Sequence, residues 1–153
     1  RWVATTVAAR DVGRAVASGL HMRLGAIEAV AEAAARNGRQ LFDVRHSAER
    51  FSTGKGTKRP GLRLLTVGTD CSVGKKYTAL ALEKGMRERG LDADFRATGQ
   101  TGIFISGRGV SVDAVVADFI SGAAEWISPA ADPGHWDVVG GQGSLFRPSF
   151  PGV

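Results

Sequence analysis

The sequence has little cysteine, no long apolar run and no recognisable leader. Its single cysteine, Cys71, excludes an internal disulfide framework and is typical of proteins from a reducing compartment. Charged residues or glycines interrupt the apolar runs, so none approaches the roughly 20 residues that a membrane-spanning helix needs. The N-terminal stretch also lacks the apolar core of a signal peptide. We therefore expect a cytoplasmic protein that has no membrane partner.

The sequence also lacks an initiator methionine, and no closing element follows "SLFRPSFPGV", which favours a fragment of a longer protein. Its 153 residues are 43% apolar and 23% charged, which is the composition of an ordinary globular chain.

The formal net charge of +5 comes from one short stretch. Residues 45–63 contain six basic side chains and one acid, Glu49, whereas the rest of the chain holds 14 basic and 14 acidic residues. A surface that binds nucleic acid needs basic residues spread over a folded face. We interpret the stretch as a solvated basic linker, residues 46–61, and expect no nucleic-acid partner.

The first part of the chain has the pattern of an α/β unit. Residues 25–38 place apolar side chains at helical spacing and end at Gly38, and residues 40–45 have the pattern of a short strand. We therefore expect residues 1–45 to be the end of such a unit. Between residues 46 and 61 no apolar period remains, which indicates a domain boundary or a long surface loop.

Residues 62–153 have the pattern of a second α/β unit. The expected elements are a strand from Leu62, a helix over residues 75–89, a strand over 92–98, a helix over 110–127 and a strand over 135–139. Strands that alternate with helices of this length imply a parallel sheet with helical crossovers.

A glycine-bounded loop, "GTDCSVGKK", joins the first of these strands to its helix. Backbone N–H groups and the positive end of a helix converge on an anion in such loops, and Lys75 would add a charge at the outer phosphates. An ordinary glycine-rich turn is the alternative. The residues predicted to bind a cofactor are Gly68, Thr69, Asp70, Cys71, Ser72, Val73, Gly74, Lys75 and Lys76.

The loop departs from a magnesium-nucleotide site at two positions. It resembles the loop of dethiobiotin synthetase, which has the same long spacing, but Lys76 stands where that loop carries a threonine that binds magnesium. The third strand offers Asp137 at its start and only Gly140 at its exit, where a second ligand belongs. We therefore predict no metal site. An ATP-using ligase or kinase with Mg²⁺ stays the alternative, with a non-catalytic anion-binding domain as a third.

The segment "TGQTGIFISGRG", residues 98–109, follows the exit of a strand, where open α/β sheets bind ligands. Thr98, Gln100 and Thr101 supply neutral donors and acceptors, and Arg108 could pair with a carboxylate. We predict that these four residues bind the substrate. A long structural turn is the alternative.

The cysteine and the histidines are each better explained without a catalytic or metal-binding role. Cys71 could be a nucleophile at a helix start, but no His or acid is evident nearby, so a small residue that fits the loop is favoured. The three histidines, His21, His46 and His135, are too scattered in sequence to suggest metal-ligand spacing.

Most of the chain resembles one family. The residues from "RLLTVGTDCSVGKK" through "ADFISGAAEW", followed by "GGQGSLFRPSF", are similar to the D-glutamate N-acetyltransferase family, and "SGLHMRLG" and "FDVR" resemble the end of its N-terminal Rossmann-like domain. The resemblance implies transfer of acetyl from acetyl-CoA to D-glutamate in bacterial D-amino acid catabolism, on a phosphate-loop fold. The implied partner is a small-molecule substrate, and a second copy of the chain stays open.

Two positions depart from the family pattern. Gly140 stands where relatives carry a glutamate, and Arg147 stands where they carry a histidine. Acetyl transfer needs a base for the amine and N–H donors for the oxyanion, and the sequence does not identify the base. The candidates for orienting the reacting groups are Gln100, Thr101, Gln142 and Ser144.

Overall fold

The structure is a computed structural model that describes residues 1–146. The chain forms two compact units, Arg1–Ala48 and Glu49–Val153. Arg147, one of the two departures from the family pattern, lies outside the described residues.

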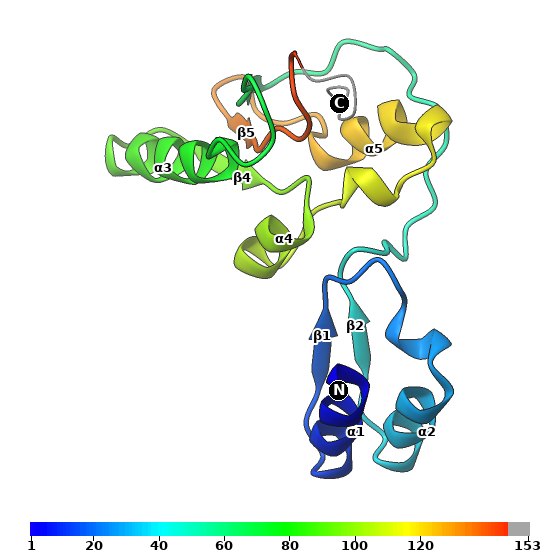
Figure 1. Ribbon diagram of the computed structural model, residues 1–153. Coiled ribbons are helices and arrows are strands. Elements are labelled where there is room, and N and C mark those ends of the chain that lie inside the picture. Colours follow the sequence, from blue (N-terminus) through cyan, green and yellow to red (C-terminus); the bar gives the residue numbers. More distant parts are fainter. Residues whose placement is uncertain (147–153) are drawn as a thin grey trace. The chain divides into compact units, whose positions relative to one another are not determined.

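The first unit pairs two short parallel strands with two helices (Figure 1). The expected helix over residues 25–38 begins later, because the Leu24 amide donates to both Asp43 carboxylate oxygens, at 2.9 and 3.2 Å, and fixes a 3-10 turn there. The elements are α1 (Trp2–Asp11), β1 (Val16–Ser18), a 3-10 turn (Leu24–Ala26), α2 (Glu28–Arg36) and β2 (Leu41–Asp43).

Arg10, near the end of α1, is fully buried, and no carboxylate partner for it is found among residues 1–146. Its guanidinium donates to the carbonyls of Arg14 at 2.8 Å, of Gln40 at 3.1 Å and of Ala34 in the last turn of α2, and also to that of Arg39. A cation there is favoured by the negative end of a helix. Sequence patterns did not single out this residue, because its partners are backbone atoms.

The second unit contains a parallel sheet in the order β3-β5-β4, formed by β3 (Leu62–Leu65), β4 (Ala93–Arg96) and β5 (Trp136–Val139). The predicted α/β class with parallel strands is therefore confirmed. Because the strands are parallel, the segments that follow all three of them leave the same edge of the sheet.

Helix α3 (Lys75–Glu88) packs on β4 and β5 (Figure 1). Its Ala79 is buried with Ala93 and Val138 of the sheet, and the partly buried side chains around them complete the core: Leu64, Met86, Phe95 and Trp136. The helix was expected over residues 75–89. Its start at Lys75 fixes which residues of the preceding loop can face a ligand.

Residues 100–106 form a helix, α4 (Gln100–Ser106), inside the segment predicted to bind the substrate, for which a long structural turn was the alternative. Gly99 precedes it and Gly107, with φ of 76°, ends it. Gly102 lies in its interior because a Cβ there would come within 2.9 Å of the Ala97 Cβ. The glycines that suggested a loop are therefore helix boundaries and a packing position.

The helix expected over residues 110–127 is wrong for its first half. The amides of Val110 and Val112 donate to the carbonyls of Ala97 and Thr98, at 3.0 and 3.1 Å, so this stretch runs beside the chain that leaves β4. β-branched residues favour such extended structure over helix. Two 3-10 turns, Val112–Ala114 and Ala117–Phe119, precede the helix α5 (Ile120–Ile127).

The basic linker predicted over residues 46–61 is exposed at residues 55–58, but residues 54–56 also bond to α5. The amide of Gly54 donates to Ser121 Oγ at 2.9 Å, and the amides of Lys55 and Gly56 donate to the Glu125 carboxylate at 3.0 and 2.8 Å. The hydrogen bond from Lys55, followed by that from Gly56, lowers the pKa of Glu125. Lys55 and Gly56 stay exposed, but their backbone amides find acceptors on α5 that no local pattern reveals.

Two arginines of the basic stretch, residues 45–63, donate hydrogen bonds to backbone carbonyls near the end of α5. Arg59 Nη1 donates to the carbonyls of Glu125 and Ser128, both at 2.9 Å. Arg63 Nη2 donates to the carbonyl of Pro129 at 2.8 Å. These two charges therefore hold the segment after α5.

Candidate functional site

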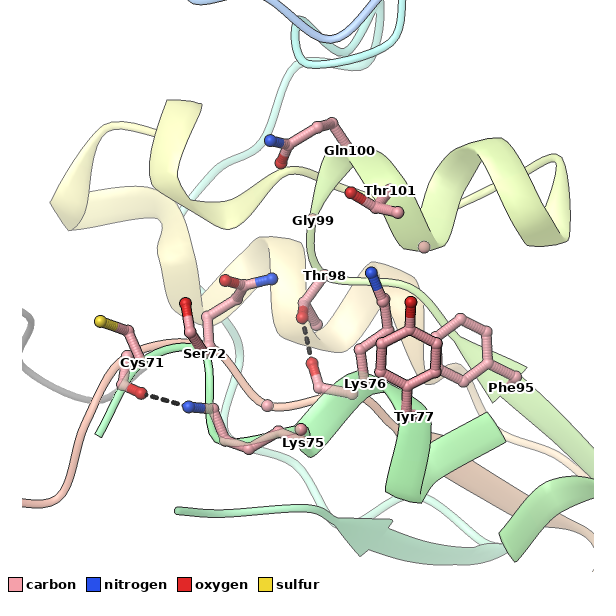
Figure 2. A pocket seen from close by; sticks show the side chains of 16 residues that line it. Cys71, Ser72, Lys75, Lys76, Tyr77, Phe95, Thr98, Gly99, Gln100 and Thr101 are labelled. Carbon is pink, nitrogen blue, oxygen red and sulfur yellow. Dashed lines mark hydrogen bonds between the residues drawn. The ribbon is translucent and has the colours of Figure 1, made fainter. Parts of the chain in front are cut away.

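A pocket lies where the chain leaves the three strands of the second unit (Figure 2). Its volume is about 450 Å³, within the usual range for a small-molecule site. Three segments line it: the phosphate loop with the start of α3, the chain after β4 with the start of α4, and residues 140–145 after β5, hereafter the return loop.

The phosphate loop, residues 68–74, has a constrained backbone. Gly74 has φ of 99° and Ser72 has φ of 61°, a left-handed conformation that is unusual for a residue with a side chain. A Cβ on Gly68 would come within 2.6 Å of Val73 Cγ2. The loop therefore turns tightly and delivers the chain to the first residue of α3.

The first turn of α3 combines unsatisfied amides with two cations. The first amides of an α-helix have no acceptor within the helix, and the earliest helical bond here is from the Thr78 amide to the Gly74 carbonyl, at 3.0 Å. The first turn holds Lys75 and Lys76 and no acidic residue. Cations are unfavourable at this end of a helix unless an anion joins them. The turn is therefore suited to an anionic ligand.

Lys75 bonds to both loops. Its Nζ donates to the Asp70 carbonyl and to the Gly143 carbonyl, each at 2.7 Å, and the second bond is dashed in Figure 2. Asp70 itself accepts a 2.7 Å hydrogen bond from the Cys71 amide through Oδ1. The lysine thus spans the phosphate loop and the return loop.

Lys76 lies on the pocket wall, and its side chain extends toward the segment that carries Gly99 and Thr101 (Figure 2). Its Nζ is 4.9 Å from the centre of the Tyr77 ring, which is 70% exposed at the pocket. Such a cation over an aromatic face gains modest energy at exposed sites. Its ammonium remains available to a ligand in the described structure, where no hydrogen bond or ion pair to it is found.

The return loop lies directly on the phosphate loop. The Leu145 amide donates to the Gly68 carbonyl at 3.1 Å, and Ser144 Oγ donates to the Thr69 carbonyl at 2.7 Å. A Cβ on Gly141 would come within 1.9 Å of the Thr66 carbonyl oxygen, so the contact requires glycine. The two loops form one unit at the sheet edge.

Thr66, the residue after β3, contacts both the return loop and the start of α3 through its hydroxyl. Its buried hydroxyl accepts from the Gly141 amide at 3.1 Å and lies 3.1 Å from the Lys75 carbonyl and 3.3 Å from the Val139 carbonyl. One hydroxyl therefore contacts the helix start, the strand exit and the return loop. Sequence reasoning missed it because a threonine at a strand end has no distinctive pattern.

The opposite wall consists of Thr98, Gly99, Gln100 and Thr101. Thr98 is buried and donates from Oγ1 to the Gly140 carbonyl, the other dashed contact in Figure 2. Gln142 reaches this wall, because a Cβ on Gly99 would come within 2.3 Å of its Nε2. Two amide side chains, Gln100 and Gln142, are therefore present at one pocket.

The structure brings most of the predicted site residues together but not all of them. Ser144 belongs to the return loop but is buried and does not line the pocket, and Arg108 lies outside the pocket because α4 ends before it. Gly68, Thr69, Asp70 and Val73 belong to the loop without lining the pocket. The predicted residues that line it are Cys71, Ser72, Gly74, Lys75, Lys76, Thr98, Gln100, Thr101 and Gln142.

Two aromatic residues at the pocket escaped the sequence analysis, Tyr77 and Phe95. Tyr77 follows Lys76 in the first turn of α3 and is exposed, and its local pattern gave no signal of a pocket position. Phe95 lies on β4, where an aromatic residue is expected for packing alone.

Neither a metal cluster nor a membrane helix is found among the described residues. Within residues 1–146, no three His, Cys, Asp or Glu side chains are grouped so that they could hold a metal ion. No helix in the same range has the length and apolar character needed to cross a bilayer. Thr78, the nearest hydroxyl to the usual magnesium position, donates instead to the Gly74 carbonyl at 3.2 Å.

Comparison with known families matches both units. Residues 50–153 match a domain of unknown function, DUF1611_C, described as a P-loop domain, and residues 1–47 match DUF1611_N, described as a Rossmann-like domain. The chain belongs to the DUF1611 family. The expected Rossmann-like and phosphate-loop parts are thereby confirmed as fold classes.

Named relatives of this DUF1611 chain agree with the resemblance seen in the sequence. A D-glutamate N-acetyltransferase from Pseudoalteromonas is 54% identical over all 153 residues, and one from Tritonibacter scottomollicae is 50% identical over 152 residues. The chain spans 46% of the length of each. The crystal structure of a DUF1611 family protein from Anabaena variabilis matches 98% of this chain with a TM-score of 0.90 and 33% identity, over 44% of its own length.

Proposed function

We propose that this chain is part of an N-acetyltransferase that moves acetyl from acetyl-CoA to the amine of D-glutamate in bacterial D-amino acid catabolism. The observation that carries the proposal is the identity of 54% over the whole chain to a relative named for that activity. The matched stretch includes the phosphate loop, the return loop and the wall at residues 98–101, which together line the pocket.

The pocket supports the binding of a large anion. Coenzyme A carries several negative charges on its phosphates, and the start of α3 offers Lys76 and unsatisfied amides to such groups. D-Glutamate, with two carboxylates, is a second anion that the same pocket could hold. The supporting feature is the absence of an acid in the first turn of α3, so that no carboxylate of this turn neutralises the charge of its two lysines.

The chemistry requires few protein groups. Acetyl-CoA supplies a thioester whose carbonyl carbon accepts the amine. The new C–N bond forms as the C–S bond breaks, the amine loses a proton and the thiolate leaves to be protonated as coenzyme A. An oxyanion develops on the carbonyl oxygen, and N–H donors at the pocket would stabilise it. The amides of Gln100 and Gln142 are the candidates, because both side chains line the pocket.

The alternative of a magnesium-dependent ligase or kinase has less support. Such an enzyme needs a hydroxyl at the helix start and an acid near a strand exit. This chain carries Lys76 at the first position and Gly140 at the second, and Thr78 is turned back onto the Gly74 carbonyl. A domain that binds anions without catalysis is distinguished by the activity test below.

We further propose a cytoplasmic location and a small-molecule substrate, without a nucleic-acid or membrane partner. The supporting observation is the use of the basic stretch: Arg59 and Arg63 donate to carbonyls at the end of α5, and the backbone of Lys55 bonds to Glu125. These groups hold the fold, so the net positive charge does not require a polyanionic partner.

The test uses the natural chain at full length. Release of coenzyme A from acetyl-CoA is followed with D-glutamate, with L-glutamate and without an amine, and the product is identified by mass spectrometry. The proposal expects D-glutamate-dependent release with N-acetyl-D-glutamate as product. ADP formation from Mg-ATP with no acetylated product would instead support the ligase alternative. The absence of both activities would support the non-catalytic anion-binding domain.

A further inference from the structure

The two adjacent lysines at the start of α3 have different surroundings. Lys75 Nζ donates to the carbonyls of Asp70 and Gly143, at 2.7 Å each. Lys76 Nζ has the Tyr77 ring beside it at 4.9 Å and extends along the pocket wall (Figure 2). Both are cations at the same helix end, so the difference lies in where each side chain is directed.

Lys75 already uses most of its donors within the protein. An ammonium group has three N–H donors and no acceptor. Two of the three are engaged by carbonyls on opposite loops, which leaves one for a ligand. A charged donor makes stronger hydrogen bonds than a neutral one, so these two bonds contribute substantially to holding the return loop.

The return loop is rich in glycine and carries Gln142 into the pocket. Its backbone lies on the phosphate loop through the Leu145 amide and Ser144 hydroxyl, and three of its residues, 140, 141 and 143, are glycines with no side chain to pack. Gln142 is the side chain between these glycines, and it reaches across the pocket to Gly99. The position of Gln142 therefore depends on how firmly the loop is fixed.

We propose that Lys75 is a positioning residue that fastens the return loop, and through it Gln142, to the phosphate loop, whereas Lys76 supplies the charge that contacts the anionic ligand. The role of Lys76 rests on the proposed function, since the ligand is taken to be coenzyme A. The role of Lys75 concerns the ligand-free protein alone. This division differs from the sequence-based expectation, in which Lys75 added its charge at the outer phosphates.

Hydrogen exchange in the ligand-free full-length chain tests the fastening. Deuterium uptake is followed by mass spectrometry in a peptide that covers residues 140–146, for the unaltered protein, Lys75→Met and Lys76→Met. Lys75→Met should speed exchange of this peptide by about tenfold, because an opening free energy lower by about 1.4 kcal/mol corresponds to that factor. Lys76→Met, the matched control in charge and size, should leave the exchange rate unchanged.

Equal exchange in the unaltered protein and in Lys75→Met would overturn the fastening. Should Lys75→Met not fold, Lys75→Gln replaces it, because its shorter side chain cannot span both carbonyls, and the same acceleration is expected. The exchange measurement uses no ligand or substrate. A negative exchange result would therefore overturn only the fastening by Lys75. The proposed function would be overturned by a different result, the absence of acetyl transfer by the unaltered protein.

Calorimetry with coenzyme A tests the other half. Lys76→Met should weaken binding by about tenfold or more, and the loss should shrink as salt rises, because screening weakens a charge contact. Lys75→Met should weaken binding less than Lys76→Met does. The reverse order, with Lys75 the larger contributor, would overturn the assignment of the ligand contact to Lys76.

A double-mutant cycle on acetyl transfer joins the two halves. If Lys75 acts through Gln142, the loss caused by Gln142→Ala should largely disappear in the Lys75→Met background, since neighbours that act as a unit are not additive. In the Lys76→Met background the loss from Gln142→Ala should persist in full. Additive losses for Lys75 and Gln142 would show that Lys75 does not act through the return loop.

Discussion

Asp137 and Arg96 form a buried ion pair across neighbouring strands, in which Arg96 Nε donates to Asp137 Oδ1 at 2.5 Å. The Arg96 side chain is 10% exposed and the Asp137 side chain is 2% exposed. Arg63 Nε lies 4.0 Å from the other carboxylate oxygen of Asp137. The acid that the sequence offered at the start of the third strand is therefore a structural residue of the sheet, and it is neutralised there by arginine.

Removing this acid should strongly destabilise the second unit. Asp137→Ala leaves the Arg96 guanidinium buried without its main partner, and losing one member of a buried pair typically costs about 3–5 kcal/mol. Urea unfolding of the full-length chain measures the change in free energy. The control is Asp94→Asn, because Asp94 lies 3.4 Å from Arg96 but is 51% exposed, and its loss should cost under about 1 kcal/mol. Similar costs for both variants would contradict the structural role of Asp137.

His135 should make stability depend on pH. Its Nδ1 lies 2.8 Å from Asp92 Oδ2 and its Nε2 lies 3.4 Å from Asp137 Oδ1, with Arg96 Nη2 also at 3.4 Å. The hydrogen bond with Asp92 raises the pKa of His135, and burial opposes it. A raised pKa in the folded state means that protonation stabilises the fold.

That stabilisation is complete below the unfolded pKa of about 6.5 and is lost as pH rises through the higher folded pKa. Asp92→Asn should therefore lower the free energy of unfolding more at about pH 6 than at about pH 9. The Asp92 side chain is 69% exposed, so the difference should stay below about 1 kcal/mol. Asp132→Asn, a nearby acid whose carbonyl and not its side chain meets the His135 amide, serves as the control. A loss that is equal at both pH values would argue against the histidine.

Ligand binding at the pocket should not need a divalent metal. Lys76 and Gly140 occupy the positions where a phosphate-loop enzyme would provide magnesium ligands. We expect the affinity for coenzyme A, measured by calorimetry, to be the same with EDTA and with Mg²⁺. A large loss of affinity on adding EDTA would move the ATP-using alternative to first place.

Gly141 should be intolerant of any side chain. A Cβ there would meet the Thr66 carbonyl oxygen at 1.9 Å, and backbone atoms at that distance cannot yield without moving the loop. Gly141→Ala should therefore displace the return loop and reduce acetyl transfer by at least about tenfold. Gly134→Ala, where a Cβ would meet nothing within 4 Å, is the matched control and should behave like the unaltered protein. Full activity of Gly141→Ala would show that the loop does not need this contact.

The sequence predicted the parts of the site that depend on local pattern. The loop between Gly68 and Gly74 and the helix from Lys75 were predictable, because an apolar strand, a glycine turn and a 3.6-residue period are each visible within a few residues. The convergence of the three strand exits followed from parallel topology. The sequence therefore predicted that Gln100 and Gln142 would act at the same site.

Contacts between distant backbone segments were not predictable. The Gly143 carbonyl that accepts from Lys75, the Thr66 hydroxyl beneath Gly141 and the amides of residues 54–56 that reach α5 have partners 9 to 75 positions away in the chain. Such partners have no signature in composition or period. The helix α4 was missed for a related reason, since Gly102 is present for its contact with Ala97.

Gly140 is the position at which one substitution should raise activity. It lines the pocket at the exit of β5, where relatives carry a glutamate according to the sequence resemblance. Its φ is outside the left-handed region, so a side chain is compatible with the backbone. A Cβ there would meet Phe95 Cε2 at 3.2 Å, which requires that ring to move by a few tenths of an ångström. The backbone conformation and the space around Cβ are therefore compatible with a side chain at this position.

A carboxylate at this position could accept the proton of the substrate amine, and general-base catalysis typically contributes about 10²-fold or more. We expect the unaltered full-length chain to acetylate D-glutamate slowly and Gly140→Glu to raise kcat by about that factor, measured by coenzyme A release. Gly140→Gln has nearly the same shape without a base, so it controls for the displacement of Phe95 and should give no increase. A fast unaltered enzyme that Gly140→Glu leaves unchanged would locate the base elsewhere. An equal rise in both variants would assign the gain to pocket shape, because only the carboxylate can take the proton.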